Sequence, residues 1–461
     1  MNCVCARFLS LSSTMKSKLL CFLCLFVAIV ICRTDDSATA DKFFFKDGDR
    51  VVFLGDSITE QRLYTTYIEA YTLTRFPTWK LSFRNVGWGG DTSWLRQRAH
   101  PDEGKLFGAD PESQQKMVEK AVASGLGRDV LPLKPTAITI KFGMNDHSYQ
   151  PFNEKIYNAY VRSQSQLGKV LKENGARVAF LTPQPIEDKR PDPDKEPKNQ
   201  SLRKFSDGLK QVATANSALF VDQFDPYMKL MLAARAEKPD AHIGGGDAVH
   251  PGAAGQTLMA WAVLKGLGAT AMVSRAELAA DSKQKLGPQP GCKIENIKTV
   301  NGVFSFDRTD DALPMPIDKR GKAALKLAPI LDELSRYELK VTGLTGVNYE
   351  LTIDGESAGA FTKDDLAKGV NLTTAEGPIT QQAQQVLKLV FDKNNAYFQR
   401  WREVQLFDAS KLPGWVKSEV EAKRKAELER LDAKIADLEA QIEAARKIKP
   451  HHFELKPVAT N

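Results

Sequence analysis

The sequence has almost no cysteine beyond its first forty residues. Five of its six cysteines lie in that segment, and Cys292 is the only one that follows it. One thiol cannot form a disulfide within a chain, so the rest of the protein must depend on packing and hydrogen bonds for its stability. The pair Cys21-x-x-Cys24 stands inside an apolar run, where a metal or redox site is not expected.

The signatures of several ligand classes are also missing. There is no arginine-rich stripe or nucleic-acid-binding motif, and the formal charge of +7 falls to +5 without the first forty residues, so no nucleic-acid partner is expected. No histidine and carboxylate residues have metal-ligand spacing. Gly244-Gly245-Gly246 lacks the Lys-Ser/Thr that follows a phosphate loop. We therefore predict neither a metal nor another cofactor.

The first forty residues have the pattern of an export signal. Lys16 and Lys18 precede the apolar run Leu19 to Ile31, and Ala38-Thr39-Ala40 has the small-x-small form of a cleavage site. The run is short for a membrane span, so an anchor is the less favoured alternative. Residues 1–40 are predicted to be a signal peptide of a periplasmic or extracellular protein, with Met15 as an alternative start to Met1.

The next region alternates short β-branched runs with helical patterns, which predicts an α/β fold with a parallel sheet covered by helices. We assign residues 41–288 to this domain. In such sheets the functional site lies beyond the carboxyl ends of the strands. The expected strands are Val51 to Leu54, Leu81 to Val86, Ala137 to Phe142, Val178 to Leu181 and Ala218 to Val221.

The second half of the sequence has a different residue pattern. Residues 289–412 are predicted to form a β-rich accessory domain, with strands at Tyr337 to Gly343 and Gln385 to Phe391. Residues 413–449 carry an apolar heptad pattern and are predicted to form a long amphipathic helix, which either pairs with a second copy in a homo-oligomer or folds back on its own chain. Residues 450–461 are taken as a tail.

A G-x-S-x-G pattern at Gly355 to Gly359 matches the motif around the reactive serine of many esterases. That motif requires a turn between a buried strand and a helix. Here Asp354-Gly355 stands between two alternating runs, which predicts a β-hairpin. We therefore do not assign a catalytic role to Ser357.

Four other motifs follow one another in the α/β domain. Three fall where strands are expected to end: Gly55-Asp56-Ser57, the glycine block Gly87 to Ser93, and Gly143-Met144-Asn145-Asp146. The fourth is Asp247-Ala248-Val249-His250. A serine hydroxyl becomes a good nucleophile when an imidazole removes its proton, and an acid on the far ring nitrogen orients the imidazole. The alternative for Ser57 alone is a helix cap.

In this order and spacing the motifs resemble the SGNH, or GDSL-type, hydrolase family over residues 50 to 268. The resemblance implies a flavodoxin-like three-layer α/β/α fold and a serine esterase. It implies Ser57 as nucleophile, His250 as general base and then acid, and Asp247 as the residue that orients His250. It also implies an oxyanion hole formed by the backbone N–H groups of Ser57 and Gly90 and by the amide of Asn145; Gly90 is preferred to Gly87 as the donor.

Aromatic residues near these motifs suggest a surface for sugar rings. Trp88 and Trp94 bracket Gly90, whereas Tyr64, Tyr67 and Tyr71 follow the nucleophile at helical spacing. Core packing is the alternative, and we favour it for Tyr67 and Tyr71. His147 is expected on a surface loop.

The substrate inference depends on the export signal, the β-rich domain and the charged loop Asp188 to Lys198, which does not suit a long acyl chain. Together they favour a secreted acetylesterase that removes O-acetyl groups from a polysaccharide. The alternatives are a short-chain lipase, a lysophospholipase or a thioesterase, a polysaccharide O-acetyltransferase, and a non-catalytic carbohydrate-binding protein.

Overall fold

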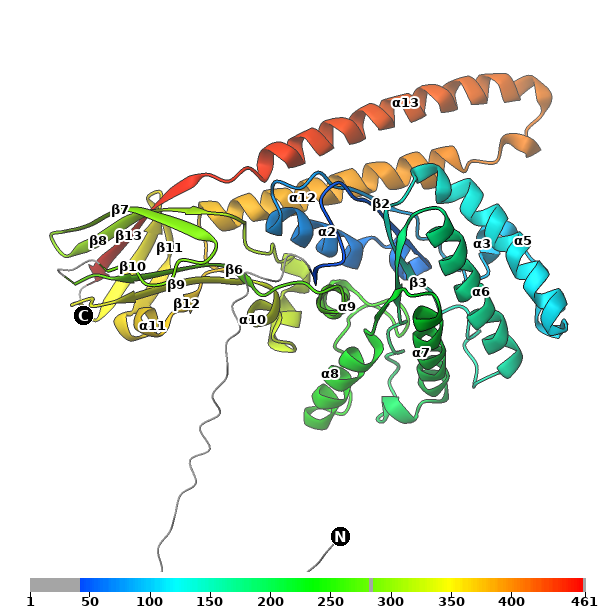
Figure 1. Ribbon diagram of the computed structural model, residues 1–461, viewed down its shortest axis with the longest axis horizontal. Helices are drawn as coiled ribbons and strands as arrows, with labels where there is room; N and C mark the ends of the chain where they lie inside the picture. Colours follow the sequence, from blue (N-terminus) through cyan, green and yellow to red (C-terminus); the bar gives the residue numbers. More distant parts are fainter. Residues whose placement is uncertain (1–41, 282–284, 459–461) are drawn as a thin grey trace, which may run out of the picture. The chain divides into compact units, whose positions relative to one another are not determined.

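A computed structural model describes residues 42–281 and 285–458. The predicted signal peptide lies outside these ranges. The α/β region contains a five-stranded parallel sheet (Figure 1). Its strand order, β2-β1-β3-β4-β5, is that of a flavodoxin-like fold. The strands are β1 (Arg50–Gly55), β2 (Ser82–Asn85), β3 (Ala137–Lys141), β4 (Arg177–Leu181) and β5 (Leu219–Val221).

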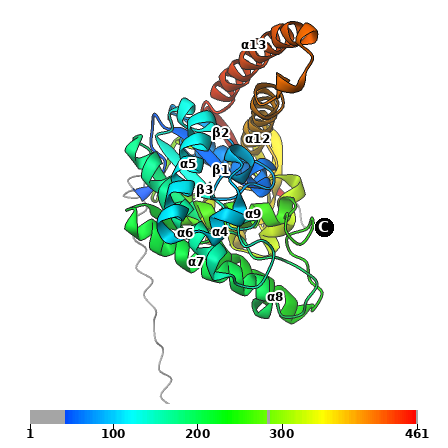
Figure 2. The same cartoon turned by 90° about the vertical axis from the view of Figure 1, so that its right-hand side faces the viewer.

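The central strands are mostly apolar and buried because helices cover both faces of the sheet. Every residue of β3 is buried, as is typical of a parallel strand between two helical layers. Helices α5, α6 and α7 pack side by side, and α2 packs against α9; Figure 2 shows the sheet among these helices. The longer helices are α2 (Leu63–Arg75), α5 (Pro111–Asp129), α6 (Glu154–Glu173), α7 (Pro197–Ala215), α8 (Phe224–Glu237) and α9 (Ala253–Gly266).

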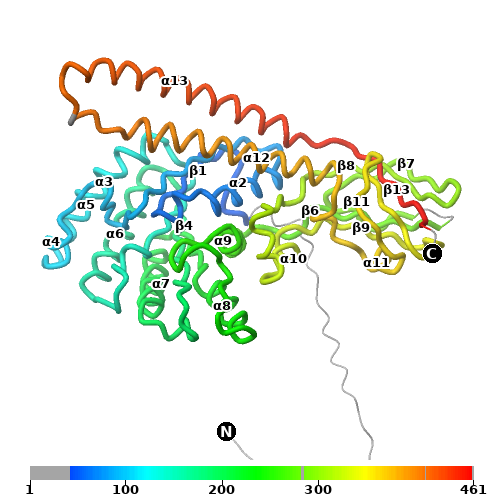
Figure 3. The backbone as a smooth tube through the Cα atoms, turned by 180° about the vertical axis from the view of Figure 1, so that it is seen from behind, coloured from blue at the N-terminus to red at the C-terminus, as the bar shows by residue number. Residues whose placement is uncertain are grey.

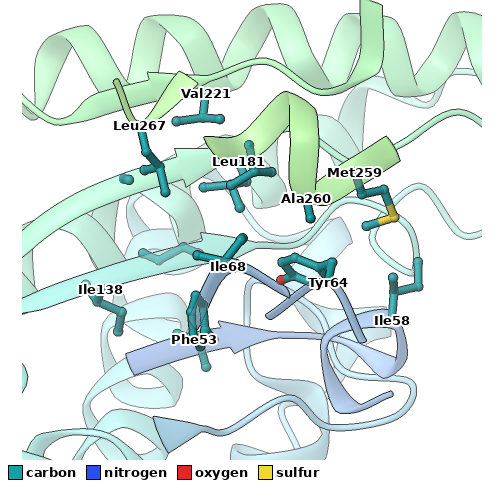
Figure 4. Close-up of a cluster of buried hydrophobic side chains, with 14 of the residues drawn as sticks. Phe53, Ile58, Tyr64, Ile68, Ile138, Leu181, Val221, Met259, Ala260 and Leu267 are labelled. Atoms are coloured by element: carbon teal, nitrogen blue, oxygen red, sulfur yellow. The ribbon is translucent and has the colours of Figure 1, made fainter. Parts of the chain in front are cut away.

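Side chains of α2 and α9 meet the sheet in one apolar core. Phe53 and Ile138 from the strands lie near Ile68 of α2, with Met259 and Ala260 of α9 beyond it (Figure 4). Burying these side chains stabilises the fold by about 25 cal/mol for each Å² of apolar surface. This packing fixes the ends of β1, β2 and β3. The short helices are α1 (Ser57–Glu60), α3 (Arg96–Ala99), α4 (Glu103–Gly108), α10 (Ile330–Leu334) and α11 (Lys363–Lys368).

The β-rich region has two sheets and a core of its own. An antiparallel sheet has the order β11-β10-β13-β8-β7, and a smaller one the order β12-β9-β6. The smaller sheet includes β6, which falls before the predicted boundary at residue 288, so this region begins earlier than expected. The strands are β6 (Met272–Ala279), β7 (Cys292–Val300), β8 (Val303–Asp310), β9 (Arg336–Thr342), β10 (Asn348–Ile353), β11 (Glu356–Thr362), β12 (Val370–Asn371) and β13 (Pro450–Val458).

The hairpin around the G-x-S-x-G pattern is confirmed. Strands β10 and β11 pair antiparallel, and Asp354 and Gly355 between them have φ values of 51° and 82°. Positive φ at both positions is the geometry of a type I′ hairpin turn. Ser357 lies exposed on β11, opposite Thr352.

Two predictions for the C-terminal region are wrong. Gln385 to Phe391 is part of helix α12 (Pro378–Phe398), whose buried Ile379, Ala383, Val386 and Val390 recur at helical spacing. The valines of this segment favour a strand locally, but the helical spacing of apolar residues extends over a longer stretch and determines the structure. The predicted tail contains β13, the central strand of the larger sheet, in which Phe453 and Leu455 alternate with less buried residues.

The long helix is confirmed as α13 (Gly414–Ala445). It folds back on α12, and Figures 1 and 3 show the two helices side by side. We call this pair, together with residues 399–413 that connect the two helices, the helical hairpin. Helix α12 in turn packs on α2 and β2 of the α/β region. The apolar seam of α13 is thus occupied within its own chain, with Leu431, Ile435, Leu438 and Ile442 buried. Pairing with a second copy stays a prediction.

Candidate active site

Ser57 is the first residue of α1, and only Asp56 separates it from the buried end of β1. The helix cap is Asp56, whose Oδ1 accepts the N–H of Ile58 at 3.0 Å. Because the neighbouring aspartate supplies the cap, the Ser57 hydroxyl is not needed for it. It lies 2.9 Å from Nε2 of His250.

The loop before α9 brings Asp247 to the other side of the His250 ring. Nδ1 of His250 is 3.0 Å from Oδ2 of Asp247. Oδ1 of Asp247 accepts the backbone N–H groups of Val249 and His250, each at 2.7 Å. Burial of the Asp247 carboxyl is slight, and these N–H groups with the His250 ring outweigh it and lower the pKa. The carboxylate therefore stays ionised beside the imidazole.

The glycine block forms a tight turn beside α1. The N–H of Asp91 donates to the carbonyl of Trp88 at 3.0 Å, and Gly90 has a φ of +75°, which fits the third position of a type II turn. Gly87 donates to Asn85 and Gly89 to Glu60. Within residues 42–281 and 285–458, no hydrogen-bond partner is found for the N–H of Gly90. This N–H is therefore available to a ligand.

The third motif connects two of the loops. Asn145 is buried, and its Nδ2 donates to the backbone carbonyl of Asp91 at 2.9 Å. Asp146 accepts the N–H groups of Ser93 and Gly143 at 2.8 and 2.9 Å. Burial raises the pKa of the Asp146 carboxyl to about 7. Asp146 thus joins the second and third loops, whereas Asn145 retains a second amide N–H.

Residues of the helical hairpin reach the glycine turn. Oε2 of Glu60 accepts the N–H of Gly89 at 2.9 Å, and its Oε1 lies 3.1 Å from Nε of Arg402. The Arg402 guanidinium lies 4.3 Å from the centre of the Trp88 ring, whose edge contacts Trp401. A π-helical segment, Gln399–Gln405, carries both hairpin residues. The turn is therefore held from α1 and from the hairpin together.

Most of the aromatic residues proposed as a sugar platform are buried. Trp94 is 1% exposed, packs on Phe107 and donates Nε1–H to Glu103 at 2.8 Å, so the prediction of a substrate surface there is wrong. Only Trp88 is partly exposed, and Arg402, Arg128 and Arg98 surround its ring. The three tyrosines Tyr64, Tyr67 and Tyr71 are buried in the core, as the core-packing alternative predicts.

His147 also differs from its prediction as a surface residue. It is 2% exposed, with Nδ1 3.2 Å from the carbonyl oxygen of Gly143. Burial lowers the pKa of its imidazole to about 4. His147 is therefore neutral near pH 7, and its ring packs on Tyr149.

A cleft of about 540 Å³ adjoins Asp247. Buried Glu187 accepts the N–H groups of Ile243 and Gly244 and so fixes the loop that leads to Asp247. The other side chains around the cleft are mostly charged or polar. They include Asp188, Lys189, Arg235, Asp240 and His242.

Sequence reasoning did not identify several of these contacts. Glu60 follows Ser57 by three residues, and Tyr149, whose hydroxyl donates to Oδ1 of Asn145 at 2.9 Å, follows Asn145 by four. Proximity to the motifs was therefore an available signal for both. Arg402 had none, because it lies far along the chain and meets Glu60 only through the fold. In the described ranges no group of three or more His, Cys, Asp or Glu residues is placed to hold a metal. None of the described helices is long and apolar enough to cross a membrane.

The comparisons with known proteins agree with this architecture. Residues 53–258 match the model of the GDSL-like lipase/acylhydrolase family. A solved structure described as a gut microbial diltiazem-metabolizing enzyme is 26% identical, with a TM-score of 0.73 over 90% of this chain and 98% of that one. No curated protein gave a match.

Two further solved structures match about half of the chain. An acetylxylan esterase from Geobacillus stearothermophilus is 21% identical and has a TM-score of 0.37, covering 49% of this chain and 96% of its own. An alpha/beta hydrolase enzyme from the metagenome of Lake Arreo, Spain, is 21% identical and has the same score, covering 49% and 98%.

Proposed function

Because residues 53–258 belong to the GDSL-like lipase/acylhydrolase family, we propose that this ester hydrolase removes O-acetyl groups from a polysaccharide, with Ser57 as its nucleophile. One observation carries the assignment of the residues: the unbroken series from Ser57 Oγ to His250 Nε2 and from His250 Nδ1 to Asp247, at 2.9 and 3.0 Å. These are the contacts that activation of a serine requires.

The reaction follows from this geometry. Ser57 Oγ attacks the ester carbonyl as His250 Nε2 takes the hydroxyl proton, and Asp247 stabilises the resulting imidazolium. The bond to the sugar oxygen breaks and His250 returns the proton to that oxygen, leaving an acetyl group on Ser57. Water then attacks the acetyl group, with His250 again taking a proton, and acetate leaves as Ser57 is regenerated.

Negative charge on the carbonyl oxygen must be stabilised during both attacks. The free N–H of Gly90, the N–H of Ser57 at the start of α1, and the remaining amide N–H of Asn145 are the donors we assign to it. Loss of one such donor typically lowers kcat by about 10²- to 10³-fold. The assignment of Gly90 is supported because the N–H groups of Gly87 and Gly89 already donate to the side chains of Asn85 and Glu60.

The acetylated polysaccharide is supported by the surroundings of the site. The cleft beside Asp247 is lined by charged groups rather than by the apolar side chains that would bind a long acyl chain. The pattern of residues 1–40 supports export, which would bring the enzyme to such polymers. A small acylated molecule is the second candidate, because the structure that matches 90% of the chain is described as a diltiazem-metabolizing enzyme.

A substrate panel tests the proposal. The full chain would be incubated with acetylated polysaccharides, an acetylated small molecule, and synthetic esters of short and long acyl chains, and product release would be followed. We expect acetate from at least one polymer and a kcat/KM that falls as the acyl chain lengthens. A preference for long chains, or hydrolysis of small esters alone, would contradict the polysaccharide assignment. Addition of a sugar acceptor shows whether acetyl transfer competes with hydrolysis.

Glu60 provides a smaller, separate prediction. In Glu60→Ala the Gly89 N–H and Arg402 both lose their partner, and loss of a hydrogen bond to a charged group costs about 1.5–3 kcal/mol. We expect kcat to fall by about 10-fold, the equivalent of about 1.4 kcal/mol, with a smaller change in KM. Steady-state kinetics with a short synthetic ester measures both.

Glu439→Ala is the matched control. It removes another ion pair between the hairpin and the α/β region, Arg84 to Glu439 at 2.7 Å, without touching the glycine turn. Equal losses of kcat in the two variants would show that Glu60 acts only through docking of the hairpin.

A further inference from the structure

We propose that Tyr149 is a positioning residue for ester hydrolysis: its hydroxyl holds the Asn145 side chain so that one amide N–H faces the developing oxyanion. This inference rests on the proposed function. Tyr149 is not one of the motif residues, and it lies on the loop after β3, four residues beyond Asn145.

The orientation of the Asn145 amide follows from its two partners. The carbonyl of Asp91 can only accept a hydrogen bond, so the group 2.9 Å from it must be Nδ2 of Asn145. Oδ1 therefore faces the Tyr149 hydroxyl, which donates to it at 2.9 Å. The two hydrogen-bond partners therefore distinguish Nδ2 from Oδ1 of Asn145. One N–H of Nδ2 remains available for a ligand.

Without the hydroxyl, Oδ1 of this buried side chain would lose its donor. An amide turned by 180° would direct oxygen rather than N–H toward the oxyanion, which is repulsive. The hydroxyl also polarises the amide, because a hydrogen bond accepted at Oδ1 makes the N–H a stronger donor. Tyr149 thus acts through Asn145 on the charge that develops in the transition state.

The backbone around Tyr149 is held in an unfavourable conformation. Ser148 and Tyr149 have φ values of 54° and 55°, in the left-handed region that residues other than glycine rarely adopt. The N–H of Ser148 donates to the carbonyl of Asn145 at 3.0 Å and closes the turn. Strain of this kind is concentrated at functional sites, where surrounding contacts maintain it. Here the left-handed conformation reverses the chain direction, so that the Tyr149 side chain lies within hydrogen-bond distance of Asn145.

Two further observations suit the tyrosine to this role. Its ring packs on the buried ring of His147, with centroids 5.1 Å apart, so the hydroxyl is directed from a fixed support. Burial, together with the charge of Asp56, raises the pKa of the Tyr149 hydroxyl to about 12. The hydroxyl consequently keeps its proton, and its capacity to donate, throughout the neutral range.

A double-mutant cycle tests the proposal. Tyr149→Phe, Asn145→Ala and the double variant of the full chain would be compared with the wild type on a short synthetic ester. We expect Tyr149→Phe to lower kcat by about 10-fold, the effect of about 1.4 kcal/mol, with KM within about 2-fold. In the Asn145→Ala background the same substitution should change kcat by less than about 2-fold, since its target is absent.

Tyr71→Phe is the matched control, because it removes a buried tyrosine hydroxyl that donates to the carbonyl of Thr270 at 2.8 Å, away from the site; its kcat should stay at the wild-type value. A second readout is inhibition by phenylboronic acid, which forms a tetrahedral adduct with a serine. Its Ki should rise in Tyr149→Phe by about the factor by which kcat falls.

An unchanged kcat in Tyr149→Phe, or an equal loss with and without Asn145, would overturn the role of Tyr149. Hydrolysis that survives Ser57→Ala would instead overturn the proposed nucleophile, and the inference with it. The two failures are therefore distinguishable.

Discussion

Ser57→Ala is expected to lower kcat by roughly 10⁶-fold, the loss that follows removal of the nucleophile in other serine hydrolases. The substitution removes the atom that lies 2.9 Å from His250, while Asp56 continues to cap α1. The fold should therefore be unchanged, and the free energy of unfolding should stay within about 0.5 kcal/mol of the wild type. Single-turnover and steady-state kinetics with a short ester measure the loss.

His250→Ala and the double variant complete the experiment. Because the two residues act as a unit, the double variant should be no slower than either single one, and a residual rate from the oxyanion donors should remain. Ser357→Ala is the matched control, since it changes the serine of the G-x-S-x-G pattern on an exposed strand. Loss of activity in Ser357→Ala with retention in Ser57→Ala would reverse the assignment.

Lys393→Met is expected to destabilise the protein by about 3–5 kcal/mol, the usual result of leaving one member of a buried ion pair alone. Nζ of Lys393 on α12 lies 2.7 Å from Oε1 of Glu69 on α2, and both side chains are almost fully buried. Burial lowers the pKa of Lys393 and raises that of Glu69, which shows how far this environment opposes an isolated charge. Urea unfolding measures the change.

Two comparisons isolate the cause. Lys388→Met removes an exposed pair with Asp392 from the same helix and should cost no more than about 0.5 kcal/mol. Combining Lys393→Met with Glu69→Gln removes both charges and keeps an acceptor for Asn394, so much of the lost stability should return. If the Lys393 and Lys388 variants were equally stable, the buried pair would contribute nothing to docking of the hairpin.

The α/β fold was predictable because its signals are local. Each strand is a short apolar run that ends at a motif, and parallel strands bring such ends to one edge of the sheet. The C-terminal region was harder to predict. Val386 to Val390 reads as a strand by residue type, yet its apolar positions continue a helical period from Ile379 to Tyr397. Strand β13 was missed because its alternating pattern is short and follows a charged helix.

The same distinction applies to the site. The four motifs are sequence signals, and the structure places His250 within hydrogen-bond distance of both Ser57 and Asp247; their catalytic role stays a proposal. Whether an aromatic residue can contact a substrate depends on its exposure, which residue type does not predict. Trp94 next to the glycine turn is buried, whereas Tyr149 is 39% exposed. The contact from Arg402 depends on tertiary folding alone.

The helical hairpin has a consequence for the order in which this enzyme is assembled. It is inserted ahead of β13, and β13 is the strand that joins β10 to β8 in the larger sheet. A nascent chain can therefore form the parallel sheet and expose Ser57 long before the hairpin and β13 exist. Until then Glu60 and Trp88 lack Arg402 and Trp401, and the β-rich sheet lacks its middle strand. Contacts across so long a stretch of chain form slowly, so we expect the glycine turn to reach its final support among the last steps of folding.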